Sequence, residues 1–286
     1  MIKVQADTVG ADVVSSPFSG EVESVFSRAC TLRIDDGRRF TLLHGGIDRG
    51  MRIVAVADHC WPALHDALRI GMPVSGDGNG LITPFGVIDW NETPVWNSPE
   101  APEKLPDSTL RQGLSNATAL LKNMLGDLVY SPLWLAAHRR FDTLCHSLSH
   151  NDLSRNDPFE TPVVRLIGAG PGLTPSGDDL LTGLLGALNA SRDSRFTHVR
   201  DIVRRYSDRT GAVSRDYLDQ ACRGWWTEKL HDVFLATVSN DDSLEPAMRA
   251  LAGHGHSSGL DLETGLIAGL SIATGCPGPF LFKEPS

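Results

Sequence analysis

The sequence predicts an α+β protein in which a small N-terminal β-barrel or β-sandwich is followed by a mainly α-helical domain. β-branched and alternating apolar runs, separated by Gly and Asp turns, fill residues 16–96, and helical periodicity follows residue 107. The helical part also carries one helix-start motif twice, at 176–188 and 258–270. Because 286 residues exceed the usual size of one domain, we expect a β-rich domain at 1–98 and a helical domain at 99–286.

The first domain is predicted to consist of short strands joined by tight turns. The Gly- and Asp-rich breaks at 35–37 and 76–80 are typical of turns between antiparallel strands. One segment, Cys60–Ile70, has a helical pattern instead. The clearest expected strands are Glu21–Phe26, Arg39–Leu43, Ile53–Val56 and Leu81–Trp90.

A connector with four prolines, residues 91–107, separates the two predicted domains. Helical periodicity then dominates, interrupted by one short apolar run at Pro162–Ile167 that we expect to be a strand. The expected helices are Ser108–Met124, Pro132–Leu148, Thr197–Gly224, Thr227–Val238, Leu244–Ala252 and Gly259–Thr274.

Charge and composition exclude several classes of protein. The net charge of −9 and the scattered basic residues disfavour nucleic-acid binding, which needs a clustered basic face. Apolar runs fall short of the roughly 20 residues that span a bilayer, and residues 1–14 do not resemble a signal peptide. The five dispersed cysteines are typical of reduced thiols. We therefore expect a cytoplasmic protein with no membrane or nucleic-acid partner.

The segment 168–179, GAGPGLTPSGDD, is the strongest functional signal in the chain. Its three leading glycines, Gly168, Gly170 and Gly172, and its two prolines predict an exposed loop whose backbone approaches a ligand closely. A helix follows from Ser176. Because the first N–H groups of a helix lack internal partners, such a junction favours the binding of an anion.

The same helix start recurs 82 residues later. SGDDLLTGLLGAL from Ser176 and SGLDLETGLIAGL from Ser258 agree at eight of thirteen positions, Gly183 and Gly265 among them. We expect the two helices to pack closely at these glycines, with their N-termini converging on one small anion. Cationic side chains would complete such a site, and the candidates are Arg165, Arg204, Arg205, Arg215 and Arg223.

Three other interpretations compete for these residues. Ser176 with Asp179, and Ser258 with Asp261, have the spacing of a capping box, in which both side chains only satisfy backbone N–H groups. Alternatively, Asp178, Asp179 and Asp261 would hold Mg²⁺, although adjacent helical residues diverge by about 100°. A dinucleotide-binding loop is disfavoured, since Leu173 replaces its third glycine.

Three segments together resemble the AllH-like subunit family of oxamate carbamoyltransferase. They are GAGPGLTPSGDDLLTGLLGAL, the spaced pattern from Thr210 through Ser214 to Gly224, and GHGHSSGLDLETGLIAGL; SPFSGEVESVFSRACTLRI and LLHGG add support. The resemblance implies carbamoyl transfer between oxalurate, or a related ureide, and phosphate in purine and allantoin catabolism. It also implies that the chain acts with two partner subunits.

The residues of the motif are compatible with small anionic substrates such as oxalurate, oxamate, carbamoyl phosphate or phosphate. Backbone N–H groups of 170–177 would stabilise charge on the carbamoyl oxygen. The candidate catalytic residues are Ser176, Asp178 and Asp179, and the candidate substrate-binding residues are Gly168, Gly170, Gly172, Thr174, Gly177, Ser214, Ser258, Gly259 and Asp261. The alternatives are a non-catalytic scaffold or anion sensor in the same complex, and a stand-alone Mg²⁺-dependent hydrolase.

Overall fold

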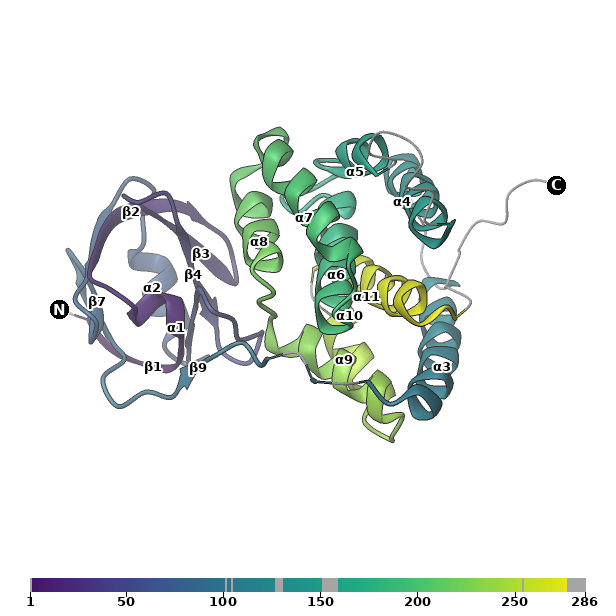
Figure 1. The fold of residues 1–286 in the computed structure, drawn as a ribbon. Coiled ribbons are helices and arrows are strands. Elements are labelled where there is room, and N and C mark those ends of the chain that lie inside the picture. Colours follow the sequence, from purple (N-terminus) through teal and green to yellow (C-terminus); the bar gives the residue numbers. More distant parts are fainter. Residues whose placement is uncertain are drawn as a thin grey trace. The chain divides into compact units, whose positions relative to one another are not determined.

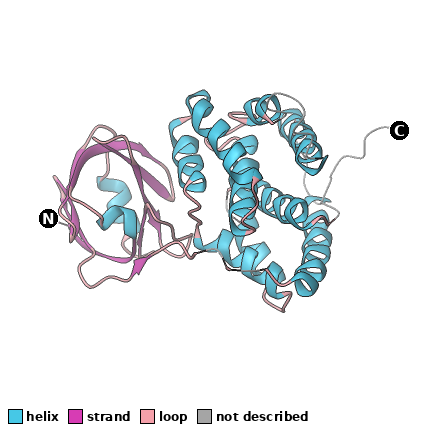
Figure 2. Cartoon of the chain, in the orientation of Figure 1, coloured by secondary structure: helices cyan, strands magenta, loops and turns pink. Residues whose placement is uncertain are grey.

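The computed structural model describes residues 2–100, 102–103, 105–126, 131–150, 159–253 and 255–276. Contacts divide the chain into two compact units. The first comprises Met1–Pro99 together with Trp226–Glu228, and the second comprises Glu100–Trp225 and Lys229–Ser286. The first unit is built mainly of strands and the second of helices (Figure 2).

The first unit is a closed barrel, drawn in purple and blue in Figure 1. Its strands run in the order β5-β4-β3-β2-β6-β7-β8-β1, and β1 closes the ring by pairing with β5 at Ala6 and Val56. The ninth strand extends the sheet beside β1. The strands are β1 (Ile2–Gly10), β2 (Phe18–Val25), β3 (Ala29–Ile34), β4 (Arg39–His44), β5 (Ile53–Val56), β6 (Pro73–Gly76), β7 (Gly80–Thr83), β8 (Gly86–Asp89) and β9 (Val95–Trp96).

The barrel interior is filled by apolar side chains from its strands and from two short helices. Val13 of α1 (Ala11–Val14) and Trp61 and Leu64 of α2 (Trp61–Ala67) belong to this core, and Figure 1 shows both helices within the outline of the ring. The indole N–H of Trp61 donates to the carbonyl of Ser27 over 2.8 Å, so its polar group is satisfied inside the core.

Of the two predicted architectures, the barrel is the one observed. The run 81–90 was expected as one strand, but it forms β7 and β8 with a turn at residues 84–85. β1 begins at Ile2, before the region in which strands were expected. The turns at 35–37 and 76–80 correctly indicated antiparallel neighbours at β3–β4 and β6–β7, whereas β1–β8 and β4–β5 are parallel. β1 and β8 are distant in sequence, and β4 and β5 are joined by residues 45–52 rather than by a tight turn, so turn residues predict neither pair.

The second unit is helical in the part that the structure describes. Several of its helices carry apolar side chains at helical spacing and bury them together. The elements are α3 (Asp107–Gly126), α4 (Pro132–His150), α5 (Glu160–Leu166), α6 (Ser176–Ala190), α7 (Arg195–Tyr206), the 3-10 turn η1 (Ser207–Arg209), α8 (Ala212–Cys222), α9 (Glu228–Ser239), α10 (Leu244–Ala252) and α11 (Ser258–Thr274).

Two predictions about these elements were wrong. The segment Pro162–Ile167, expected as a strand, forms most of helix α5 and its C-cap. Its proline lies in the first helical turn, where the missing N–H has no partner to lose, and seven residues are too few to show helical periodicity. The helix expected at Thr197–Gly224 is broken into α7, η1 and α8, with Thr210 in an extended conformation.

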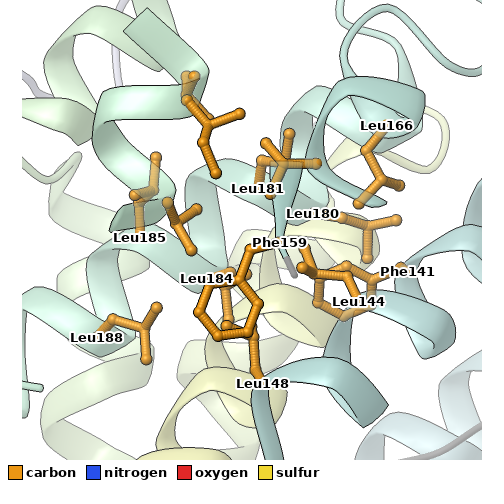
Figure 3. Close-up of a cluster of buried hydrophobic side chains, with 14 of the residues drawn as sticks. Phe141, Leu144, Leu148, Phe159, Leu166, Leu180, Leu181, Leu184, Leu185 and Leu188 are labelled. Carbon is orange, nitrogen blue, oxygen red and sulfur yellow. The ribbon is translucent and has the colours of Figure 1, made fainter. Parts of the chain in front are cut away.

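Helix α6 lies at the centre of the helical core (Figure 3). Its leucines Leu180, Leu184 and Leu188 are fully buried against Phe141 of α4 and Phe159. Each such leucine contributes about 1.5–3 kcal/mol by burial. Because most positions of α6 are buried, this helix is held in a fixed position, and so are the polar residues in its first turn.

Helices α6 and α11 touch through their backbones. A side-chain carbon placed on Gly183 would lie 2.1 Å from the carbonyl oxygen of Leu262, and one on Gly265 would lie 2.1 Å from the carbonyl oxygen of Leu180. The contact is therefore reciprocal and possible only with glycine at both positions. The predicted close packing at Gly183 and Gly265 is confirmed.

Candidate functional site

The glycine-rich loop runs from the end of α5 into α6. Gly168, Gly170 and Gly172 have φ values of 74°, 122° and 98°, in the region that favours glycine. A side-chain carbon on Gly170 would also lie 2.7 Å from the backbone nitrogen of Ser176. The loop therefore folds back tightly onto the start of the helix, while its tip at Leu173 is 58% exposed.

Asp178 ties this loop to a second segment of the unit. Its Oδ1 accepts the backbone N–H of Gly168 over 2.9 Å, and its Oδ2 accepts the hydroxyl of Thr210 over 2.5 Å. Burial raises the pKa of Asp178, and these two hydrogen bonds oppose the rise by stabilising the charged form. The hydroxyl of Ser214 acts weakly in the same direction without hydrogen-bond geometry.

Asp179 points to the other repeat of the motif. Its Oδ2 accepts the hydroxyl of Ser258 over 2.5 Å, and Thr174 of the loop lies 3.2 Å from the same hydroxyl. The loop, the start of α6 and the start of α11 therefore meet in one cluster. The two helix starts therefore lie close together, and the binding of one anion between them stays a prediction.

The electrostatic environment of Asp179 favours its neutral form. Burial raises the pKa of Asp179 well above its usual range, and the negative charges of Asp261 and Asp178 raise it further. Hydrogen bonds from Ser258 and Thr174 oppose this rise only in part. Asp179 is therefore a candidate proton donor near neutral pH.

Asp261 is buried in α11 and is held by two side chains of α4 that the sequence did not single out together. Its Oδ1 accepts the indole N–H of Trp134 over 2.9 Å and lies 2.6 Å from Nε2 of His138. The Trp134 and His138 rings stack 3.6 Å apart. Their separation by four residues in α4 was the one signal that they share a helix face.

The capping-box interpretation of Ser176 and Ser258 is wrong. Helix α6 has Pro175 as its N-cap and α11 has Ser257, and neither N-cap makes a side-chain capping hydrogen bond. The Ser258 hydroxyl donates instead to Asp179, on the other helix. Asp261 likewise turns to α4 rather than back to its own helix start.

Three backbone donors at the start of α6 are already engaged, those of Gly177, Asp178 and Asp179. The N–H of Gly177 donates to the carbonyl of Ala169 over 2.7 Å, so Gly177 does not supply the expected free donor for a carbamoyl oxygen. Side-chain carbons on Gly177 and Gly259 would lie 2.1 and 1.9 Å from the carbonyl oxygens of Leu166 and Leu251. These two glycines therefore permit close packing. Ser176 is buried, with 2% of its surface exposed.

The five candidate arginines are dispersed among different surroundings. Arg165 lines a cavity beside Gly168, whereas Arg205 pairs with Glu160. The remaining three, Arg204, Arg215 and Arg223, line a separate cavity with Asp219. The described residues contain no group of three His, Cys, Asp or Glu side chains arranged to hold a metal ion.

A family comparison covers the region that contains this cluster. Residues 166–270 match the family model described as oxamate carbamoyltransferase subunit AllH. Residues 166–270 are AllH-like. The predicted family resemblance is confirmed over this region, which includes Thr174, Asp178, Asp179, Ser258 and Asp261.

The AllH-like region does not contain every member of the cluster. Trp134 and His138, which hold Asp261, precede it in the sequence. No solved structure matches the chain. Among the described residues, no helix is long and apolar enough to cross a membrane.

Proposed function

We propose that this protein is a subunit of an oxamate carbamoyltransferase of the cytoplasm that acts together with two partner subunits. One observation carries the proposal: within the AllH-like region, Thr174, Asp179 and Ser258 are joined in a single hydrogen-bonded cluster. Two segments distant in sequence supply these groups, the loop with the start of α6 and the start of α11. We infer that this duplicated helix start holds the small anionic substrate.

The proposed reaction is the phosphorolysis of oxalurate or a related ureide, and its reverse. An oxygen of phosphate bonds to the carbamoyl carbon, the bond from that carbon to the amide nitrogen breaks, and the nitrogen takes up a proton. The products are oxamate and carbamoyl phosphate, and the proton lost by phosphate restores the acid. In this direction the reaction needs a general acid beside the leaving nitrogen.

Asp179 fits the role of that acid. Because burial and neighbouring carboxylates raise its pKa, it retains a proton under conditions in which an exposed aspartate is ionised. Thr174 and Ser258 hold its side chain and would orient the substrate with their hydroxyls. Asp178, which binds Gly168 and Thr210, would position the loop. Ser176 would contact the substrate only after a local rearrangement, because it is buried.

The test is an Asp179→Asn substitution in a complex reconstituted from this chain and the two partner subunits. We expect phosphorolysis of oxalurate to fall roughly 100-fold or more, because general acid catalysis contributes about 10²–10⁴-fold. The matched control is Asp242→Asn, at an exposed turn of the same unit. Size-exclusion chromatography would verify assembly of both variants.

The same experiment decides between catalysis and a scaffold or anion-sensing role. The scaffold alternative is favoured by Asp178, whose two oxygens both bind the protein itself. If the Asp179→Asn complex assembles and turns over at the normal rate, the cluster is not catalytic and the scaffold role replaces the proposal.

A further inference from the structure

A cavity of about 430 Å³ is lined in part by the first residues of the glycine-rich loop. Arg140 of α4, Arg165 of α5 and Arg209 of η1 line it, together with Gly168 and Ala169. Three positively charged side chains from three elements thus surround one space next to the AllH-like loop.

These positive charges are not neutralised by the protein surface that the structure describes. No acidic residue lines the cavity, and no ion pair of the described residues involves the three guanidinium groups. Arg140 donates one hydrogen bond to the backbone carbonyl of Arg165 over 3.0 Å. This bond orients the guanidinium group without neutralising its charge. The cavity lined by Arg204, Arg215 and Arg223 differs, because Asp219 lies in it and pairs with Arg223.

The frame of the cavity is held by Asp178. The backbone N–H of Gly168 and the hydroxyl of Thr210, the residue after Arg209, both donate to this carboxylate. A side-chain carbon on Gly168 would lie 2.9 Å from the carbonyl oxygen of Arg209, so these two walls touch. The segments that carry the cavity are therefore fixed before any ligand arrives, which lowers the entropic cost of binding.

We propose that this cavity binds inorganic phosphate or the phosphoryl group of a small metabolite. Guanidinium groups match the oxygens of phosphate in geometry and charge, and several of them together favour a dianion over a monoanion. The volume admits a small molecule. The identification of this cavity as the phosphate subsite of carbamoyl transfer rests on the proposed function. The binding of phosphate itself does not require that function.

The test is isothermal titration of the full chain with inorganic phosphate at constant ionic strength. We expect saturable binding at one site, displaced by sulfate and not by chloride. Arg165→Gln and Arg209→Gln should each weaken binding roughly tenfold or more, as expected for loss of a hydrogen bond between charged groups. Arg249→Gln, at an exposed position of α10, is the matched control and should leave binding unchanged.

Thermal unfolding would verify that each variant is folded, which is expected because the three side chains are exposed. Unsaturable phosphate uptake, or unchanged affinity in both cavity variants, would overturn the inference. Asp179→Asn should retain phosphate affinity. Suppose that the Asp179→Asn complex turns over normally and the arginine variants lose phosphate binding. The proposed function would then be rejected, and the phosphate site would be supported.

Discussion

Asp178 and Asp179 are neighbours in the sequence and bind different parts of the molecule. Asp178 holds Gly168 and Thr210, and Asp179 holds Ser258. The divergence follows from the roughly 100° turn between adjacent helical residues. This divergence could be predicted from the sequence, and so could the contact between Asp179 and the start of α11. The partners of Asp178 could not be predicted, because Thr210 is brought to it by a break between helices that periodicity did not indicate.

Glu263 is a second unusual acid, one turn beyond the cluster. It is fully buried in α11, and neither of its oxygens has a hydrogen-bond partner among the described residues. Burial raises the pKa of Glu263 well above its usual value, and the nearby backbone N–H of Ala252 offsets this slightly without hydrogen-bond geometry. In the first helix start the same position is occupied by Leu181.

Replacing Glu263 with leucine should therefore stabilise the protein at neutral pH by about 1–3 kcal/mol, the cost of an unsatisfied buried polar group. The gain should grow as pH rises from 4 to 8. Above its ordinary pKa the glutamate of the unfolded chain ionises, whereas the folded one keeps its proton, so the original protein loses stability with rising pH. The leucine variant lacks this loss.

Urea unfolding at several pH values would measure the effect of Glu263→Leu. Glu245→Leu is the control, because Glu245 is exposed on α10 and should show no pH-dependent gain. If the gain from Glu263→Leu is absent or shrinks between pH 4 and 8, Glu263 is not neutral in the folded protein.

At the scale of the elements, the pairing of α6 with α11 depends on two glycines. Long, strongly periodic helices were predicted to within a few residues, α10 identically. The failures were short or interrupted elements: the seven-residue α5 and the α7–η1–α8 break. Over such lengths helical and extended patterns are indistinguishable. The glycine that both motifs share did indicate the contact between α6 and α11. The need for glycine at such a contact is steric and can be recognised from the residue itself.

Gly183→Ala should destabilise the protein by about 1–3 kcal/mol or more. The added methyl group would collide with backbone atoms, which cannot move aside as a side chain can by changing its rotamer. Gly253→Ala is the control, because a side-chain carbon there meets neighbours only at 3.6 Å. Its effect should stay within about 0.5 kcal/mol. Guanidinium unfolding of both variants provides the comparison. Equal stability of Gly183→Ala and the original protein would show that α6 and α11 separate easily at this point.

At the scale of the whole molecule, we propose that 1–98 and 99–286 are separate domains. The barrel has a closed sheet and a core of its own. It also receives a short segment from much later in the chain: Thr227 bridges to Gly50, and Glu228 pairs with Arg49. No pattern in the sequence indicated this return, because three residues carry no periodicity.

A protein consisting of residues 1–99 should fold cooperatively and melt at a lower temperature than the barrel of the full chain. Its closed sheet is retained, but the bridge at Gly50 and the ion pair at Arg49 are lost. Circular dichroism during heating would measure both transitions. A gradual loss of signal without a transition would show that the barrel needs the rest of the chain, and the proposed domain boundary would fail.

The return of Trp226–Glu228 to the barrel also sets an order of events during synthesis on the ribosome. The first unit emerges early but receives its last pieces only after most of the helical unit has been translated. Nascent barrels thus wait in an incomplete form, with the carbonyl of Arg49, which later accepts the N–H of Glu228, open to solvent or chaperones. A stall between codons 100 and 226 would therefore release an unfinished barrel.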